Sequence, residues 1–194
     1  MKNWAKELRR SLTAVLSLAV IVGGLYPAAV WVLGQGLFPA KANGSLVRRN
    51  GTTLGSSLIG QDFFGPAYFH PRPSAAGPGY DAARSGGSNL GPLSKKLADT
   101  IRQRVADYRA ENTLDPRAPV PADAVTASAS GLDPHISLKN ALNQAARVAR
   151  ARGSSETAVR RLIKIYAQSR DLGLWGEPRV NVLMLNLALD RGSK

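Results

Sequence analysis

The 194-residue chain contains no cysteine, so it can form no disulfide framework and has no thiol nucleophile. This absence fits an oxidising compartment but does not establish one. Histidine is almost as scarce, with only His70 and His135. The sequence also lacks zinc-ligand spacing, a calcium-binding loop and a G-x-x-x-x-G-K-[ST] phosphate loop. Residue chemistry alone therefore gives no clear sign of an enzyme.

Acidic residues are in the minority, with 13 against 26 lysines and arginines and a net charge of +13. In a soluble protein this balance would first suggest nucleic acid. No recognisable nucleic-acid motif is present, however, and the apolar segment described next indicates a membrane protein. We therefore expect no nucleic-acid partner. Anionic lipid headgroups or an acidic surface of a partner protein are the better counterparts.

Charge is absent between residues 11 and 33, which read SLTAVLSLAVIVGGLYPAAVWVL. As a helix this segment would be about 34 Å long, and the hydrocarbon core of a bilayer is about 30 Å thick. A cleaved signal peptide has a shorter apolar core, and a buried helix of a soluble protein is usually shorter or carries a polar stripe. We therefore predict one retained transmembrane helix over residues 11–33.

The segment before the span predicts its orientation, because basic residues stay preferentially on the cytoplasmic side. Its charged residues are Lys2, Lys6, Arg9 and Arg10 against Glu7. We therefore expect residues 1–10 in the cytoplasm and residues 34–194 outside it.

Small residues line one side of the predicted span, namely Ala19, Gly23, Gly24 and Ala28. Such a line lets a partner helix approach closely, although glycine is also simply common in membrane helices. Pro27 removes a backbone donor and clashes with the preceding turn, which predicts a kink at this point.

The remainder of the chain is long enough for one domain, and its patterns predict an α+β fold. Residues 46–54 read as a β-hairpin around an Asn-Gly turn. Further short strands are expected at residues 57–61 and 67–70. Residues 70–92 are rich in glycine, proline and serine, and we expect an ordered loop folded over the domain rather than a flexible linker.

Two helices should follow this loop. The first presents an apolar face made of Leu97, Ile101, Val105 and Tyr108. Ser137 should cap the second helix, and Gly153 should close it in a left-handed conformation. The apolar face of the second helix is made of Leu138, Ala141, Leu142, Ala145, Val148 and Ala149.

The C-terminal part predicts two further elements. A third helix should be capped by Ser155 and end at Gly173. Residues 180–189 fit either a short buried helix capped by Asn181 or a buried strand, and we favour the helix. The complete prediction is one N-terminal transmembrane helix followed by a single extracytoplasmic α+β domain.

Two patterns could carry chemistry, and each has a simpler interpretation. Ser130, Asp133 and His135 could form a hydrolytic triad, but no nucleophile-elbow G-x-S-x-G is present. An Asp-Pro-His sequence before a helix is more typical of a capped turn. Residues 85–89 (SGGSN) could bind an anion through backbone amides, or could be a glycine-rich turn that serves its own backbone.

Six features of the chain carry a resemblance to a known family. One is the N-terminal span. The other five are GSSLIGQDFFGPAYFHPRPSAA, YDAARSGGSNLGP, VPADAVTASASGLDPHIS, NQAARVARARG and GEPRVNVLMLNLALD. In this order they resemble the KdpC family, the C subunit of the Kdp-type potassium-transporting P-type ATPase of bacteria. Two departures are small: Leu138 stands where a proline is usual, and Ala129 where a glycine is common.

This resemblance implies an accessory role in an ATP-driven potassium importer of the bacterial inner membrane. The subunit would assist assembly and raise the ATP affinity of the hydrolysing subunit, as a catalytic chaperone that is not itself catalytic. The implied partners are a potassium-translocating subunit and an ATP-hydrolysing subunit, with a small single-span subunit as a further candidate. Potassium is the transported ion, ATP acts through the complex, and no cofactor or metal of this chain is implied.

The resemblance also implies candidate residues. A nucleotide contact would involve Ser128, Ser130, Gly131 and Gln144, yet the predicted topology places these residues away from cytoplasmic ATP. An effect on ATP affinity would then be transmitted through the membrane helices. Interface candidates, besides the small residues of the span, are Phe63, Phe64, Tyr68, Phe69, Arg72, Ser88 and Asn89. The aromatic residues among them could equally complete the core of the domain.

Two other functions stay open at this stage. One is a membrane-anchored envelope hydrolase with His135 as the general base. The other is a lipid-surface binding domain that uses the basic helices, although a run of charge on a helix is usually a solvated face.

Overall fold

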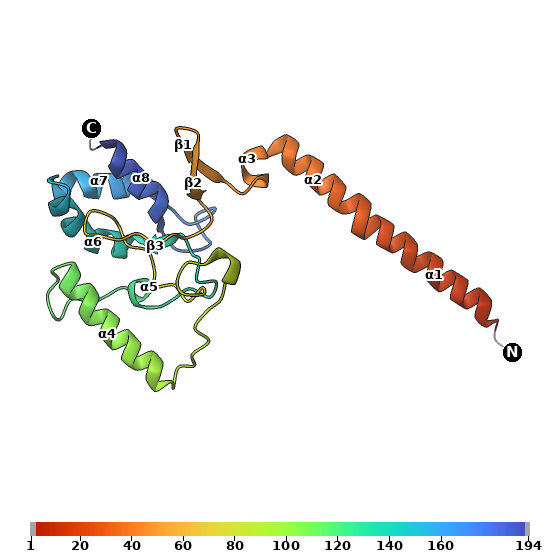
Figure 1. Ribbon diagram of the computed structural model, residues 1–194, viewed down its shortest axis with the longest axis horizontal. Coiled ribbons are helices and arrows are strands. Elements are labelled where there is room, and N and C mark those ends of the chain that lie inside the picture. The colour runs from red at the N-terminus through yellow and green to blue at the C-terminus, as the bar shows by residue number, and fades with distance from the viewer. Residues whose placement is uncertain (1–2, 193–194) are drawn as a thin grey trace.

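The computed structural model describes residues 3–192. It begins with one continuous helix made of α1 (Trp4–Val20), the π-helical segment η1 (Ile21–Leu25) and α2 (Tyr26–Leu37). This helix stands clear of the rest of the chain (Figure 1), and none of its most apolar stretch is buried. It is long and apolar enough to cross a membrane. It also extends beyond the predicted span of residues 11–33 at both ends.

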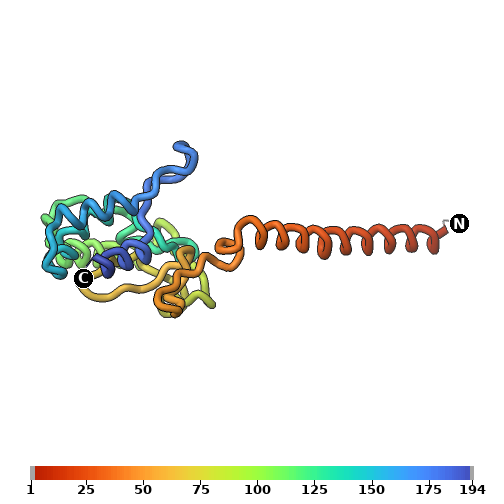
Figure 2. Tube along the Cα trace, turned by 90° about the horizontal axis from the view of Figure 1, so that it is seen from above, coloured from red at the N-terminus to blue at the C-terminus, as the bar shows by residue number. Residues whose placement is uncertain are grey.

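The predicted kink at Pro27 is absent. Pro27 lies in the first turn of α2, directly after the π-helical segment. Figure 2 shows the helix continuing in one direction past this point. A wider turn before the proline re-routes the hydrogen bonds that the ring would interrupt, and this accommodates the proline without a sharp bend. Of the basic residues that set the expected orientation, Lys2 lies outside the described residues.

A short helix, α3 (Pro39–Ala42), leads from the span into the predicted hairpin. Strands β1 (Leu46–Arg49) and β2 (Thr52–Ser56) pair antiparallel. Asn50 and Gly51 both have positive φ angles, 51° and 79°, as the tight turn between the strands requires. The hairpin prediction is therefore confirmed.

The expected strands at residues 57–61 and 67–70 do not form. In the second segment the backbone groups bond to distant side chains instead of a neighbouring strand. The backbone N–H and C=O of Phe69 bond to the side-chain amide of Asn186, at 2.9 and 3.0 Å. The backbone of His70 bonds in the same way to the amide of Gln144, at 2.7 and 3.1 Å. Two buried side-chain amides thus replace strand pairing.

A three-stranded antiparallel sheet was not predicted from the sequence. Its strands lie in the order β3 (His135–Ser137), β5 (Arg179–Asn181) and β4 (Ala167–Gln168). Strand β4 begins directly after α7 (Glu156–Tyr166). The third predicted helix therefore ends at Tyr166, and the expectation that it reaches Gly173 is wrong.

The other helices agree with the sequence patterns. They are α4 (Lys95–Glu111), α6 (Leu138–Ala151) and α8 (Val182–Gly192). Two short helical pieces, η2 (Ala82–Arg84) and α5 (Ala122–Val125), were not predicted from the sequence. The side chains of Ser137 and Ser155 accept the capping hydrogen bonds predicted for them. Asn181 ends β5 and also accepts the Met184 amide at 3.1 Å. The segment 180–189 is therefore both strand and capped helix.

The core lies between the three-stranded sheet and helices α6, α7 and α8, which Figure 1 shows together at one end of the domain. Its fully buried side chains include Phe69, Ile136, Ile163, Val180 and Leu185. The loop of residues 70–92 is ordered against the domain, as predicted, with Ala76 completely buried. The predicted α+β class is confirmed.

Candidate functional site

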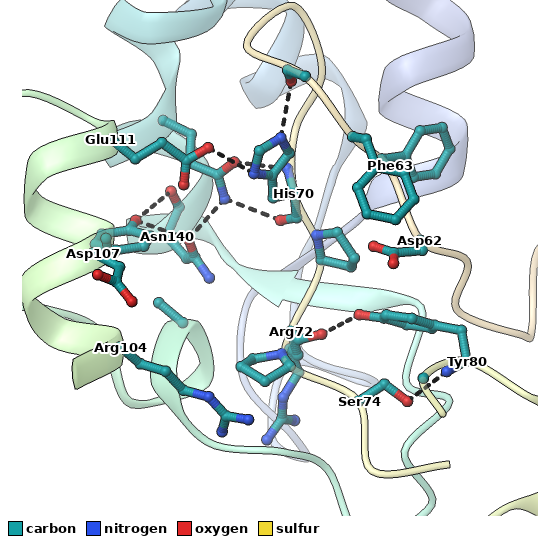
Figure 3. Close-up of a pocket in the computed structure, with 18 of the residues that line it drawn as sticks. Asp62, Phe63, His70, Arg72, Ser74, Tyr80, Arg104, Asp107, Glu111 and Asn140 are labelled. Atoms are coloured by element: carbon teal, nitrogen blue, oxygen red, sulfur yellow. Dashed lines mark hydrogen bonds and ion pairs between the residues drawn. The ribbon is translucent and has the colours of Figure 1, made fainter. Parts of the chain in front are cut away.

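A pocket of about 480 Å³ opens between α4 and the segment of residues 62–80 (Figure 3). Charged side chains of both signs line it, namely Asp62, His70, Arg72, Arg104, Asp107 and Glu111. Its wall is completed by Phe63, Phe64, Tyr80, Asn140 and Gln144. Three carboxylates thus face two guanidiniums and one imidazole, so the pocket presents charge of both signs rather than the mainly positive lining that would favour a polyphosphate.

The floor of the pocket is a closed network of buried amides. Gln144 is only 1% exposed. Its Oε1 accepts hydrogen bonds from the His70 backbone N–H and from the Arg147 guanidinium, and its Nε2 donates to the His70 carbonyl and to Oδ1 of Asn140. Asn140 in turn accepts from the Tyr108 hydroxyl at 2.9 Å and donates to Asp123. Burial raises the pKa of Tyr108 above its ordinary value, which keeps the hydroxyl protonated as a donor. All four hydrogen-bonding positions of the Gln144 amide are therefore in use.

Arg147 connects three segments around this floor and is 4% exposed. Its guanidinium donates to the carbonyls of Pro66 and Tyr68, at 2.8 and 3.0 Å. It also donates to Asn112 at 3.0 Å and to Gln144 at 2.7 Å. Because a planar guanidinium has five donors in a fixed fork, one side chain can hold the loop, α4 and α6 together.

His70 links the same loop to the end of α4. Its Nδ1 lies 2.8 Å from Oε1 of Glu111, and its Nε2 lies 2.9 Å from the carbonyl of Gly65. The hydrogen bond from His70 lowers the pKa of Glu111, and the nearby charges of His70 and Arg147 lower it further against the opposing effect of burial.

Arg72 and Asp133 form a second connection, at 2.8 Å, between the pocket and the turn before β3. Burial would raise the pKa of Asp133, but hydrogen bonds from His135 and Arg72 outweigh it and lower the pKa to about 2. The Tyr80 hydroxyl donates to the Arg72 carbonyl, and burial raises the pKa of Tyr80. Figure 3 shows Tyr80, Arg72 and Ser74 together at one side of the pocket.

The four candidate nucleotide residues do not share one place. Ser128 and Ser130 are near each other, with their hydroxyl oxygens 3.5 Å apart, and Gly131 follows. The carbonyls of Ser130 and Gly131 accept from Gly86 and Ser74 of the covering loop. Gln144 lies in the floor of the pocket, which the other three do not line.

The interface candidates of the domain divide into buried and exposed side chains. Phe69 is fully buried in the core, which favours the structural interpretation for this residue. Phe63 packs against the core and stacks on Tyr68 with ring centroids 5.8 Å apart. Phe64, 80% exposed at the rim of the pocket, is free to meet a partner. Ser88 and Asn89 are also exposed, whereas the Arg72 guanidinium is paired internally.

The small residues of the span do lie together. Ala19, Gly23, Gly24 and Ala28 line a shallow groove on the exposed helix, whose other walls are apolar. Nothing within 4 Å would meet a Cβ at either glycine, so the groove is open to a neighbouring helix. Whether a partner fills it stays a prediction.

The possible catalytic groups serve local structure. Asp133 accepts the His135 amide at 3.0 Å, as in a capped turn. The Ser130 hydroxyl accepts the Leu132 amide, and within residues 3–192 no hydrogen bond connects it to His135. Gly86 of the SGGSN turn donates its backbone N–H to the Ser130 carbonyl. This bond favours a structural turn over an anion-binding site. Among the same residues no group of three or more His, Asp or Glu could hold a metal ion.

The sequence did not reveal Arg147 or the paired amides as organising residues. Arg147 lies on the buried side of α6, beside Gln144 and Val148. A cation at a core-facing position of an amphipathic helix was the available signal, because a buried charge needs dedicated partners.

Comparison with known proteins gives one consistent result. The family model for KdpC, described as "K+-transporting ATPase, c chain", matches residues 8–191. The potassium-transporting ATPase KdpC subunit of Mycobacterium tuberculosis is 54% identical over 186 residues, covering 96% of this chain and 98% of that protein. The KdpC subunit of Nitratidesulfovibrio vulgaris is 55% identical over 184 residues, 94% of this chain and 93% of that protein. The KdpC subunit of Koribacter versatilis is 50% identical over 188 residues, covering 95% of this chain and 94% of that protein.

Proposed function

Because the chain belongs to the KdpC family, the C chain of K+-transporting ATPases, we propose that it helps to assemble the pump and raises the ATP affinity of the hydrolysing subunit. The chain is a subunit of a multi-subunit potassium-transporting ATPase, and potassium is the ion transported by that complex. The proposed contacts are with the potassium-translocating subunit, the ATP-hydrolysing subunit and a small single-span subunit.

The observation that carries this proposal is an apolar helix, Trp4–Leu37, whose most apolar stretch is not buried by any of the residues that the structure describes. One helix with a groove of small residues is suited to packing against partner helices, since close backbone approach drives helix association in lipid. The proposed location is the bacterial inner membrane, with residues 1–10 in the cytoplasm and the α+β domain outside, beside the entrance for potassium.

In this topology the effect on ATP affinity is transmitted rather than direct. The amide of Gln144 is fully used within the domain, and the carbonyls of Ser130 and Gly131 accept hydrogen bonds from the covering loop. Coupling between the outer domain and the nucleotide site requires that the membrane helices have two states, and that each of the two sites favours one state over the other. The groove on the span is the proposed place where this chain contributes.

The first test compares two glycine substitutions in the span. Gly23→Leu fills the groove, whereas Gly36→Leu places the same side chain in open space elsewhere on the helix. The tagged full chain is expressed with the other subunits, solubilised gently and purified. We expect the Gly36→Leu chain to co-purify with a complex that has potassium-stimulated ATP hydrolysis. The Gly23→Leu chain should co-purify with much less of this complex. A wild-type chain that purifies alone from cells expressing the partners would overturn the proposal.

The second test separates direct from transmitted effects on ATP. The Ser128→Ala and Ser130→Ala variants are assembled into the complex, and KM for ATP is measured. If the effect is transmitted through the span, KM for ATP should be unchanged in complexes with either serine variant. It should be raised in those complexes that still assemble with the Gly23→Leu chain. A raised KM in the serine variants, with normal assembly, would instead support the nucleotide contact implied by the family.

A further inference from the structure

An arm of residues 168–178, between β4 and β5, projects from the domain as the blue segment that stands clear of it in Figure 2. Every residue of the arm is exposed. Its tip carries three large apolar side chains: Leu172, Leu174 and Trp175, exposed by 85%, 74% and 63%. Apolar groups gathered on a projection are not explained by the domain's own core, and exposed apolar clusters mark interaction sites.

The arm is held in one shape although it contacts no core. Asp171 and Trp175 exchange two backbone hydrogen bonds of 2.8 and 3.0 Å, which closes the tip. Two ion pairs brace the stem, Arg170–Glu177 and Arg179–Asp171, each at 3.1 Å. A shape that exists before binding lowers the entropy lost on association.

The backbone at the tip also points to a use for its side chains. Leu172 has a φ of 53° and is followed by Gly173 at 77°. Asparagine or glycine would occupy the position of Leu172 at lower cost, because a bulky side chain rarely adopts this left-handed conformation. An apolar side chain therefore stands, 85% exposed, at a position where the backbone conformation disfavours it.

The charge of the arm distinguishes between two kinds of surface that could cover the tip. An anionic lipid surface is bound by free lysines and arginines next to the apolar groups. Here Arg170 of the arm and Arg179 at the start of β5 are each paired with a carboxylate of the arm, so neither is a free cation, and residues 168–179 together carry no net charge. A neutral apolar peg that includes tryptophan is instead typical of an anchor that fills a pocket in a protein.

We propose that the arm of residues 168–178 is a docking peg, whose tip inserts into an apolar pocket with an uncharged polar rim on the outer surface of a partner subunit of the pump. This inference rests on the proposed function and deepens it. The span would bring the two subunits together, and the peg would fix the outer domain in one position over its partner.

The absence of cysteine allows a direct test. In the full chain, Leu174→Cys and Leu93→Cys each introduce the sole thiol, and each is labelled with a photoreactive maleimide in the assembled complex. Leu93 is a matched control, 99% exposed but located outside the arm. We expect Leu174→Cys to cross-link to a protein subunit identified by mass spectrometry, and Leu93→Cys to give little product.

The outcomes separate the peg from the rest of the proposal. Adducts with lipid alone, or no adduct in a complex that purifies intact, would overturn the docking peg and leave the accessory-subunit function standing. A chain that fails to purify with the partners would overturn that function first. As a second measurement, Trp175→Ala should speed the loss of this subunit from the purified complex about thirtyfold, as expected for a hot-spot anchor. An unchanged rate would contradict the peg.

Discussion

Nδ1 of His70 lies 2.8 Å from Oε1 of Glu111, which joins the segment covering the core to the last turn of α4. On the other side of the ring, Nε2 faces the carbonyl of Gly65 at 2.9 Å. Since both ring nitrogens face acceptors, both bonds form together only when the imidazole carries two protons. The wall of the pocket therefore depends on the charge of these two side chains.

Glu111→Gln should destabilise the domain by about 1 kcal/mol at neutral pH, a value reduced because the carboxylate is partly exposed. The pKa of Glu111 is lowered in the folded state. Its stabilisation is therefore present above the unfolded pKa and is lost as pH falls through the folded value. Chemical denaturation of the full chain in detergent, at neutral and at strongly acidic pH, would measure this. The difference between variant and wild type should disappear in acid.

Asp107→Asn is the control for this prediction. Asp107 lies one turn earlier on α4 and lines the same pocket, and within residues 3–192 its one hydrogen-bond donor is the exposed Gln103. Its substitution should change the free energy of unfolding little at any pH. An equal loss in both variants would show that general charge in the pocket, rather than the His70 pair, sets the stability.

Arg147→Met should cost about 3 kcal/mol, because it removes a buried guanidinium that donates to one buried and two partly buried acceptors. The affected acceptors include the carbonyls of Pro66 and Tyr68 and the side chain of Asn112. Arg147→Lys should recover only part of the loss, since an ammonium lacks the planar fork. The denaturation midpoints of the two variants decide the question. Full recovery by lysine would show that charge alone is required.

Asp133→Asn tests the connection between Arg72 and the turn before β3. With a pKa of about 2 in the folded state, ionised Asp133 stabilises the fold above its unfolded pKa. The contribution, at most about 2 kcal/mol, is lost as pH falls from about 4 to about 2. The variant should therefore be less stable at neutral pH and equal to wild type near pH 2. Asp99→Asn, which breaks only the exposed pair with Arg102, should change little.

Local signals explain which elements could be predicted from the sequence. Ser137, Ser155 and Asn181 cap helices through bonds to amides three residues away, so the sequence contains both partners. The Asn50-Gly51 turn and the apolar span are equally local. These features were sufficient to predict the α+β class and the one long apolar helix near the N-terminus.

The errors concern partners that are far apart in the sequence. Phe69 and Asn186 are separated by 117 residues, and His70 and Gln144 by 74. The segment around Phe69 was therefore predicted as a strand, although a buried side-chain amide satisfies the backbone of Phe69. Strand β4 has only two residues, too few for a period-2 pattern to be visible. The pocket shares this origin, since the His70–Gln144 pair forms part of its floor.

Gly131 provides the sharpest test of how the candidate nucleotide segment is held. Its φ is 68°, and a Cβ added there would lie 2.6 Å from the backbone nitrogen of Ala76 and 2.7 Å from the Gly86 carbonyl. Gly153 has a similar φ of 61°, but a Cβ there would meet nothing within 4 Å. Gly153→Ala should therefore cost only the conformational strain, about 1 kcal/mol. Gly131→Ala should cost that and more, because backbone from two segments of the covering loop would have to move. The free energies of unfolding of the two variants, measured on the full chain in detergent, isolate the steric part. Equal losses would mean that the covering loop yields freely, and that residues 128–131 are accessible to a ligand rather than clamped under it.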